Sequence, residues 1–274
     1  MLINVGGKLM DLSIPRVMGI INVTPDSFYA ESRRDLLGSL KTAEQFLKEG
    51  CDILDIGAYS SWIHSKEISS EQEWARLEEP LNAIRKEFPG AVISIDTFRA
   101  DVAKKAINCG ANIINDISGG SLDSKMVDVI SSCQVPYILM HMRGTPNNMQ
   151  DFTQYEDLIV DLTNYFVNKI TVLRERKVKD IIIDPGFGFS KSLEQNYILL
   201  NHLDKFKIFD LPILVGLSRK SMIYKLFDIS AKDALNGTSV LNFVALNNGA
   251  NILRVHDVKE AKQVVKLYDM LNDN

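Results

Sequence analysis

The stretch that decides the fold is an apolar run that stops in polar residues: Val17-Met18-Gly19-Ile20-Ile21-Asn22-Val23-Thr24-Pro25-Asp26-Ser27-Phe28. Residues 17–21 have the length and composition of a buried β-strand, and the residues after them are typical of a loop. Loops at strand ends often carry active sites, but Asn, Pro, Asp and Ser are also ordinary turn formers. The pattern must therefore recur along the chain before it indicates a functional site.

Short apolar runs of this kind recur through the whole chain. They cover residues 17–22, 53–57, 91–96, 112–116, 136–141, 180–184, 213–216 and 252–255. Stretches with apolar residues at helical spacing lie between them, for example 36–49, 71–87, 100–109, 155–176 and 234–247. Eight β-α units in about 250 residues favour a closed (β/α)8 (TIM) barrel of the α/β class. An open doubly wound sheet usually has a Gly-rich phosphate turn after its first strand, and no G-x-G-x-x-G follows residues 17–22.

The composition favours a single soluble domain, residues 1–274, because 46% of the residues are hydrophobic and no Gly/Ser/Pro-rich linker divides the chain. A net charge of −4 offers no basic surface for nucleic acid. No apolar run approaches the roughly 20 residues of a membrane span, and residues 1–15 lack a signal-peptide pattern. Cys51, Cys109 and Cys133 have no C-x-x-C spacing, so we expect free thiols in the cytoplasm.

In a barrel of this class the C-terminal ends of the strands meet at one mouth, where the polar residues that end the runs should converge. These are Asn22, residues 55–61, Asp96, Asn115 with Asp116, His141, Asp184, residues 218–221, and Arg254 with His256. A charge at the end of a buried run is costly unless it is paired or binds something. Their joint occurrence predicts a ligand site at the mouth.

Three of these residues are rich in hydrogen-bond acceptors. Asp96, Asn115 and Asp184 suit the N–H edge of a flat heterocycle, and two carboxylates can clamp a guanidine-like face. The alternative is that the two acids only cap helices or form pairs inside the barrel.

Other strand endings offer cations. Lys220 precedes an apolar stretch that can begin a short helix, and Arg254 and His256 share one side of a strand by period two. Together they suit a diphosphate, and Asn22 could orient a hydrated Mg2+ on the same phosphates. The alternative is that Lys220 and Arg254 form ordinary ion pairs and that His256 is structural.

Several segments, in order and over nearly the whole chain, resemble those of the dihydropteroate synthase family. They are residues 22–28, 55–57, 94–97, 115–118, 139–146, 184–189, 218–221 and 254–257. The resemblance implies that the pterin is held by Asp96, Asn115, Met140, Asp184 and Lys220, with Met140 packed on its ring. It assigns diphosphate to Asn22, Arg254 and His256, and the metal to Asn22. The p-aminobenzoate site would comprise Thr24, Pro25, Phe28, Ser61, Trp62, Phe187 or Phe189, and Ser221 beside the stem of Lys220.

The implied transferase reaction joins 6-hydroxymethyl-7,8-dihydropterin diphosphate to p-aminobenzoate, with Mg2+ as cofactor. If the C–O bond breaks first, the pterin carries a cation and the leaving diphosphate takes negative charge, so acids are needed near one and cations near the other. The catalytic residues would be Asn22, Asp96, Lys220, Arg254 and His256. The family commonly forms homodimers, which the resemblance also implies here.

The loop after the second barrel strand departs from the family pattern. The family usually has Ser-Thr-Arg-Pro-Gly or Ser-Ser-Arg-Pro-Gly, whereas this chain has Ser60-Ser61-Trp62-Ile63-His64. An Arg-to-Trp change removes a bidentate anion contact and adds a flat apolar surface. Arg33 or Arg34 could supply the absent charge. We expect an active enzyme with weakened sulfonamide binding; the alternatives are weak activity or none.

Two other functions remain open on sequence grounds. A pterin-binding methyltransferase that serves a corrinoid protein shares the barrel and the pterin acids, but it has no use for residues 218–221 or for a diphosphate site. A catalytically silent pterin-binding protein would bind the pterin and form no product. Release of diphosphate distinguishes both from a synthase.

Overall fold

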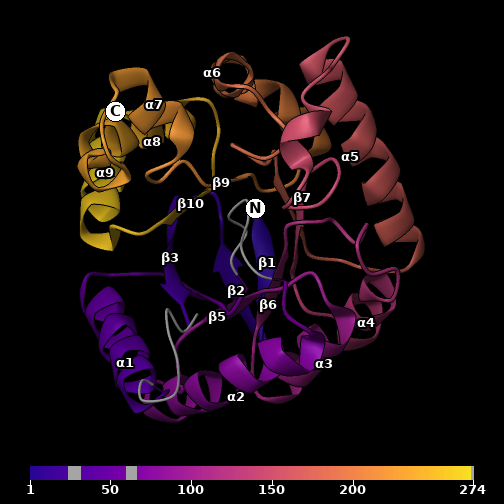
Figure 1. Ribbon diagram of the computed structural model, residues 1–274, viewed down its shortest axis with the longest axis vertical. Helices are drawn as coiled ribbons and strands as arrows, with labels where there is room; N and C mark the ends of the chain where they lie inside the picture. Colours follow the sequence, from indigo (N-terminus) through magenta and orange to yellow (C-terminus); the bar gives the residue numbers. More distant parts are fainter. Residues whose placement is uncertain (24–31, 60–66, 273–274) are drawn as a thin grey trace.

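The protein is a closed barrel of parallel strands inside a ring of helices (Figure 1). The computed structural model describes residues 1–23, 32–59 and 67–272. The barrel strands are β3 (Arg16–Asn22), β4 (Ile53–Gly57), β5 (Ile93–Asp96), β6 (Ile113–Asp116), β7 (Tyr137–Met140), β8 (Ile181–Asp184), β9 (Leu214–Val215) and β10 (Ile252–Val255). They pair in the order β8-β7-β6-β5-β4-β3-β10-β9, and a parallel bridge between Ile183 and Ile213 joins the two edges. The predicted (β/α)8 barrel is confirmed.

Helices alternate with these strands along the described residues. They are α1 (Ser32–Lys48), α2 (Ser70–Glu87), α3 (Ala100–Asn108), α4 (Met126–Cys133), α5 (Leu158–Glu175), α6 (Leu193–Asn201), α7 (Ser221–Phe227), α8 (Leu235–Asn247) and α9 (Val258–Asn272), with short 3-10 helices η1 (Met149–Phe152), η2 (Leu203–Phe209) and η3 (Ala231–Asp233). Capping boxes begin two of them, Ser69 with Gln72 at α2 and Ser192 with Gln195 at α6. No helix in the described part of the chain is long and apolar enough to span a membrane.

An antiparallel hairpin, β1 (Leu2–Val5) and β2 (Lys8–Asp11), precedes the barrel and was not predicted from the sequence. Its two-residue turn is made by Gly6 and Gly7, both at positive φ, which glycine adopts without strain. Ile3 and Val5 are buried against the residues that fill the lower half of the barrel. The hairpin therefore closes the end of the barrel opposite the mouth, and Figure 1 places it near the centre of the ring.

Inward-facing apolar side chains fill the lower part of the barrel. This lower layer consists of Met18, Ile53, Ile113, Ile138, Ile182, Leu214 and Ile252, all buried and in one cluster with the hairpin. A second, larger cluster fills the space between the strands and the helices. Since side chains alternate across a strand, the residue two positions after each lower-layer residue also faces inward, one step closer to the mouth.

Candidate active site

The upper layer of the barrel interior is polar on most strands. Two positions beyond lower-layer residues stand Asp55 on β4, Asn115 on β6, Met140 on β7, Asp184 on β8 and Arg254 on β10, and Asp96 ends β5 beside Asn115 in register. The lower layer is apolar and mostly Ile. Two positions further along the same strands, the inward-facing side chains include acids, an amide and a guanidinium. The sequence-predicted residues Asp96, Asn115, Met140, Asp184 and Arg254 are brought together on this layer.

Arg254 is the centre of a partly buried ion-pair network. Its Nε atom donates to Asp55 Oδ2 at 2.7 Å, and one terminal nitrogen donates to Asp96 Oδ2 at 2.6 Å. Asn115 donates from Nδ2 to the same Asp55 oxygen at 3.2 Å. Asp55 is fully buried, and its other oxygen, Oδ1, has no hydrogen-bond partner among the described residues. Asp55 thereby orients both Arg254 and Asn115, a role that the sequence prediction did not assign to it.

Burial makes the carboxyl groups of Asp96 and Asp184 weaker acids than they are in water. It raises the pKa of Asp96 to about 7, against the opposing effect of Arg254 and with help from the nearby Asp55. Burial also raises the pKa of Asp184, which Lys220 opposes. Burial disfavours the charge on Arg254, but Asp55 and Asp96 outweigh it and raise the guanidinium pKa. Two carboxylates share one guanidinium, so the upper layer can accept a cationic or N–H-rich ligand.

Lys220 reaches the same mouth from the loop after β9. Its Nζ donates to the carbonyl of Phe187 and lies 4.7 Å from the centre of the Phe189 ring. A side chain at Gly188 would crowd the Lys220 stem, with a Cβ 3.2 Å from Lys220 Cδ. Burial lowers the pKa of Lys220 to about 8, although Asp184 favours its charge. Lys220 is therefore a partly buried cation that loses its proton more readily than a lysine in water.

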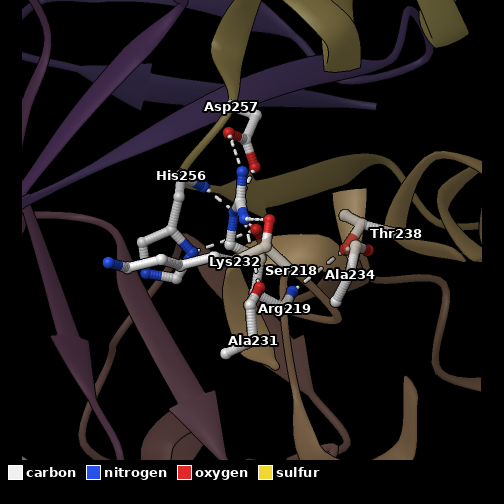
Figure 2. A network of polar contacts seen from close by, with 8 residues as sticks. All are labelled: Ser218, Arg219, Ala231, Lys232, Ala234, Thr238, His256 and Asp257. Carbon is white, nitrogen blue, oxygen red and sulfur yellow. Dashed lines mark hydrogen bonds and ion pairs between the residues drawn. The ribbon is translucent and has the colours of Figure 1, made fainter. Parts of the chain in front are cut away.

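A hydrogen-bond network fixes the segment that carries Lys220 (Figure 2). Arg219 has positive φ and forms a bidentate pair with Asp257 at 2.8 Å for each bond. Ser218 Oγ lies 3.0 Å from His256 Nδ1 and also accepts from the His256 backbone N–H. The ends of β9 and β10 are thus tied together, which places Lys220 and His256 on the same side of the mouth.

The imidazole of His256 keeps an exposed edge at this site. Surrounding protein atoms and the nearby Arg254 guanidinium lower the pKa of His256 to about 4. At neutral pH the ring is therefore uncharged, and its Nδ1 contact with Ser218 leaves Nε2 available to a ligand.

One wall of the mouth is apolar. Met140 packs with Ile117, Met142 and Met149, and the partly buried Phe98, Leu122 and Phe189 lie against them. Of the two candidate phenylalanines, Phe187 is fully buried in the cluster between strands and helices, so only its carbonyl meets Lys220. The ring that borders the mouth is that of Phe189. Ser221 is the first residue of α7 and is half-buried, and Asn22 is exposed at the end of β3.

Two strand endings expected at the mouth turn away from it. Asp116 follows the inward-facing Asn115 by one position and points outward, where it accepts from the Tyr137 hydroxyl at 2.7 Å and from Ser118. His141 follows Met140 in the same way and is buried with its ring 4.8 Å from that of Tyr165. Both expectations were wrong because adjacent residues of a strand face opposite sides.

Five sequence-predicted residues of the p-aminobenzoate site lie outside the described residues. They are Thr24, Pro25, Phe28, Ser61 and Trp62. The segment 62–64, in which this chain departs from the family pattern, lies there as well.

A closed barrel whose mouth combines acids, an amide and cations defines an enzyme for a flat, hydrogen-bonding substrate. Residues 18–256 match the model of the family described as pterin binding enzyme. The chain is 37% identical over 266 residues to the dihydropteroate synthase of Escherichia coli K12, which covers 96% of this chain and 94% of the relative. It is 39% identical to that of Synechocystis, over 93% of this chain and 89% of the relative. The chain therefore belongs to the pterin-binding enzymes, in the dihydropteroate synthase family.

Solved structures agree with this assignment. The structure superposes on the Yersinia pestis dihydropteroate synthase in complex with a sulfonamide drug with a TM-score of 0.94, at 35% identity and over 100% of both chains. The Xanthomonas albilineans enzyme with 4-aminobenzoic acid gives a TM-score of 0.92 at 30% identity, over 100% of this chain and 98% of the other.

Proposed function

We propose that this protein is the dihydropteroate synthase of a folate pathway. It joins 6-hydroxymethyl-7,8-dihydropterin diphosphate to p-aminobenzoate and releases diphosphate. The observation that carries the proposal is the mouth itself, where the carboxylates of Asp96 and Asp184 lie within one layer with Arg254 and beside Lys220. Family membership over nearly the whole chain supports the same reaction.

The pterin fits the polar upper layer and its apolar wall. Asp96, Asn115 and Asp184 provide oxygens that accept from the N–H groups of the pterin, and Lys220 donates to a pterin acceptor. Met140 packs against the flat ring from the apolar side. The buried position of these acids strengthens their interaction with a charged pterin, since the local dielectric constant is low.

The reaction proceeds by departure of diphosphate before attack. The C–O bond breaks with both electrons going to diphosphate, which leaves a cation on the pterin methylene. The carboxylates of Asp96 and Asp184 stabilise this cation, while Arg254, His256 and Lys220 stabilise the negative leaving group. The amine of p-aminobenzoate then uses its lone pair to form the C–N bond and loses one proton to solvent. Because the cation is reactive, correct positioning of the amine is the main requirement.

Mg2+ is the proposed cofactor. Among the described residues no group of three or more His, Cys, Asp and Glu could hold a metal ion. The carbonyl oxygen of Asn22, at the exposed end of β3, fits an ion that keeps mostly water and phosphate oxygens as ligands. When bound, Mg2+ would neutralise charge on the diphosphate. An Asn22→Ala variant should need a higher Mg2+ concentration for half-maximal rate; an unchanged Mg2+ dependence would contradict this role.

The p-aminobenzoate site is proposed beside Lys220. The Phe189 ring, the Lys220 stem and Ser221 form the described part of it. The sequence resemblance alone adds Thr24, Pro25, Phe28, Ser61 and Trp62. Since Trp62 stands where the family has Arg, we propose reduced affinity for sulfonamides. A Trp62→Arg variant should lower the inhibition constant for sulfamethoxazole; equal inhibition of both forms would contradict this.

The deciding experiment is the Mg2+-dependent formation of dihydropteroate from the two substrates, followed by a coupled assay for diphosphate. Product and diphosphate in equal amounts support the proposal. Tight pterin binding without product would instead indicate a silent pterin-binding protein. Methyl transfer from methyltetrahydrofolate to a corrinoid protein, without diphosphate release, would indicate a methyltransferase.

We also propose a homodimer through α7 and α8, in the cytoplasm. Leu226 and Phe227 at the end of α7, Ile229 just after it and Val240 on α8 are exposed, and Phe227 lies against α8 near Gly237. The free thiols of the chain suit a reducing compartment. Sedimentation of the wild type should give a dimer and that of Phe227→Asp a monomer; a monomeric wild type would refute the dimer.

A further inference from the structure

Lys191 is a buried lysine just outside the mouth, with only 3% of its surface exposed. Its Nζ atom lies 2.9 Å from the carbonyl oxygen of Gly186, 3.0 Å from that of Phe189 and 3.1 Å from Nδ1 of His141. An amine buried to this extent is costly unless its hydrogen bonds are complete, as they are here. No role was assigned to Lys191 by the sequence or by the proposed reaction.

The segment that Lys191 binds, residues 184–189, contributes three features of the mouth. The backbone N–H of Gly186 donates to Asp184 Oδ1 at 2.8 Å and so orients that carboxylate. The Phe187 carbonyl accepts from Lys220 Nζ, and the Phe189 ring lies beside the same atom. The orientation of successive peptide groups in this turn therefore determines where Asp184 and Lys220 lie.

The turn 184–189 is pressed against the end of β7. Gly186 has φ +73°, and a Cβ atom there would lie 2.1 Å from the His141 carbonyl oxygen. The backbone N–H of His141 donates to the Asp184 carbonyl at 3.0 Å. Lys191 lies at this contact and forms hydrogen bonds to both sides of it. On the turn it bonds to the carbonyls of Gly186 and Phe189, and on the β7 side it bonds to the His141 ring. It thus fastens the turn to β7 from within.

The contacts with the two carbonyls do not depend on the charge of Lys191. Burial lowers the pKa of both Lys191 and His141 well below their ordinary values, although Asp184 favours the charged lysine. A neutral amine still has two N–H donors for the carbonyls and can accept from His141 Nδ1–H, whereas an ammonium donates to all three. Both forms hold the turn.

We propose that Lys191 is a positioning residue, which clamps the turn 184–189 onto β7 and thereby places Asp184 and Lys220 for the pterin. This inference rests on the proposed function, because the affected substrate is the pterin diphosphate. Lys191→Met removes the donors at similar volume, and we expect the KM for pterin diphosphate to rise at least tenfold. The KM for p-aminobenzoate should also rise, but less, because the Phe189 ring and the Lys220 stem of its site depend on the same turn.

A matched control is available in Lys169, whose Nζ clamps a different loop through the Gly119 carbonyl at 2.8 Å and Ser121 Oγ at 2.9 Å. Lys169→Met should lower the melting temperature but leave the pterin KM within twofold. A double-mutant cycle adds Asp184→Asn. In that background Lys191→Met should weaken pterin binding, measured by calorimetry, by a smaller factor than it does in the wild type, because only the placement of Lys220 is still lost. Full additivity would overturn the inference.

The outcomes separate the two hypotheses. A wild type that forms no dihydropteroate refutes the proposed function. An active wild type with an unchanged pterin KM in folded Lys191→Met refutes the clamp, as does an equal effect of Lys169→Met. If Lys191→Met does not fold, Lys191→Gln, which keeps two N–H donors, is measured instead. Its pterin KM should rise above that of the wild type, but by less than the tenfold expected for Lys191→Met. Failure of both variants to fold would mean that Lys191 serves stability alone, and it would overturn the inference.

Discussion

The lower and upper layers of the barrel interior stand two residues apart on the same strands, and the lower layer is apolar whereas the upper layer is polar on most strands. Below, Ile53, Ile182 and Ile252 pack together and against the N-terminal hairpin. Above, charged groups such as Asp55 and Arg254 are held by ion pairs and hydrogen bonds. Burial of the apolar layer stabilises the barrel. The upper layer can therefore contain charged groups, although such groups are costly to bury. Stability and catalysis should therefore respond differently to changes in the two layers.

The largest expected effect comes from Arg254→Met in the upper layer. It removes the cation that receives diphosphate, and kcat/KM should fall by about 10²–10³-fold. It also leaves the buried Asp55 without a cationic partner and with only the Asn115 amide, which should reduce the free energy of unfolding by about 3 kcal/mol in urea denaturation. Ile252→Val, two residues below on β10, should cost about 1 kcal/mol and leave kcat/KM within twofold. An unchanged kcat/KM in Arg254→Met would contradict the expected difference between the two layers.

A second test compares the two faces of β6. Asn115→Ala, facing inward, should raise the KM for pterin diphosphate about tenfold, because one buried hydrogen bond is worth about 1.5 kcal/mol. Asp116→Ala, facing outward, removes the acceptor of the buried Tyr137 hydroxyl and should cost about 1–3 kcal/mol in unfolding free energy. The pterin KM of Asp116→Ala should stay within threefold. Equal kinetic effects of the two variants would contradict the assignment.

The upper layer should also make activity depend on pH. Asp96 with its pKa raised to about 7 must lose its proton to act as a carboxylate, so kcat/KM falls as the pH drops through 7. Lys220 with its pKa lowered to about 8 must keep its proton, so kcat/KM falls as the pH rises through 8. A profile from pH 5 to 10 should be bell-shaped, with roughly fivefold to tenfold loss at pH 6. Ile252→Val should give the same profile, and a flat one in the wild type would refute the assignments.

The smallest expected effect distinguishes two nearby rings. Phe189→Leu should raise the KM for p-aminobenzoate about threefold to fivefold, since the ring borders the mouth and contributes stacking worth about 1 kcal/mol. Phe187→Leu changes the buried cluster instead and should lower the melting temperature with little change in that KM. Steady-state kinetics at saturating pterin diphosphate measure both. The reverse pattern would assign the Phe187 ring, and not the Phe189 ring, to the p-aminobenzoate site.

Much of the barrel could be predicted because each strand is a short apolar run that ends in polar residues. The runs expected at 53–57 and 252–255 match the bounds of β4 and β10, and the other barrel strands differ by one or two residues at their ends. The N-terminal hairpin was missed because β1 and β2 have four residues each and bury only one face. Such short, half-exposed strands carry too weak a periodic signal, although the Gly6-Gly7 pair was an available indication of a hairpin turn.

The site was predicted in part for the same physical reason. Side chains alternate between the two faces of a strand, so residues on the upper layer, such as Asn115, point into the barrel. Their convergence therefore follows from the fold. By the same rule Asp116 and His141, each one position after an inward-facing residue, face outward and not the mouth. The rule says nothing about the turn 184–189, where positive-φ glycines redirect the chain, and so Phe187 and Phe189 could not be distinguished. Lys191 gave no sequence signal, because lysines in loops are usually solvated.

The hairpin that closes the barrel has a practical consequence for measurement. Its strand β1 begins at the second residue, and Met1 is partly exposed at the end of the molecule remote from Lys220 and Arg254. A tether attached at this terminus would hold the protein on a sensor surface with the ligand entrance turned toward the flowing solution. Immobilised in that orientation, the protein should give the same pterin affinity as it does free in calorimetry.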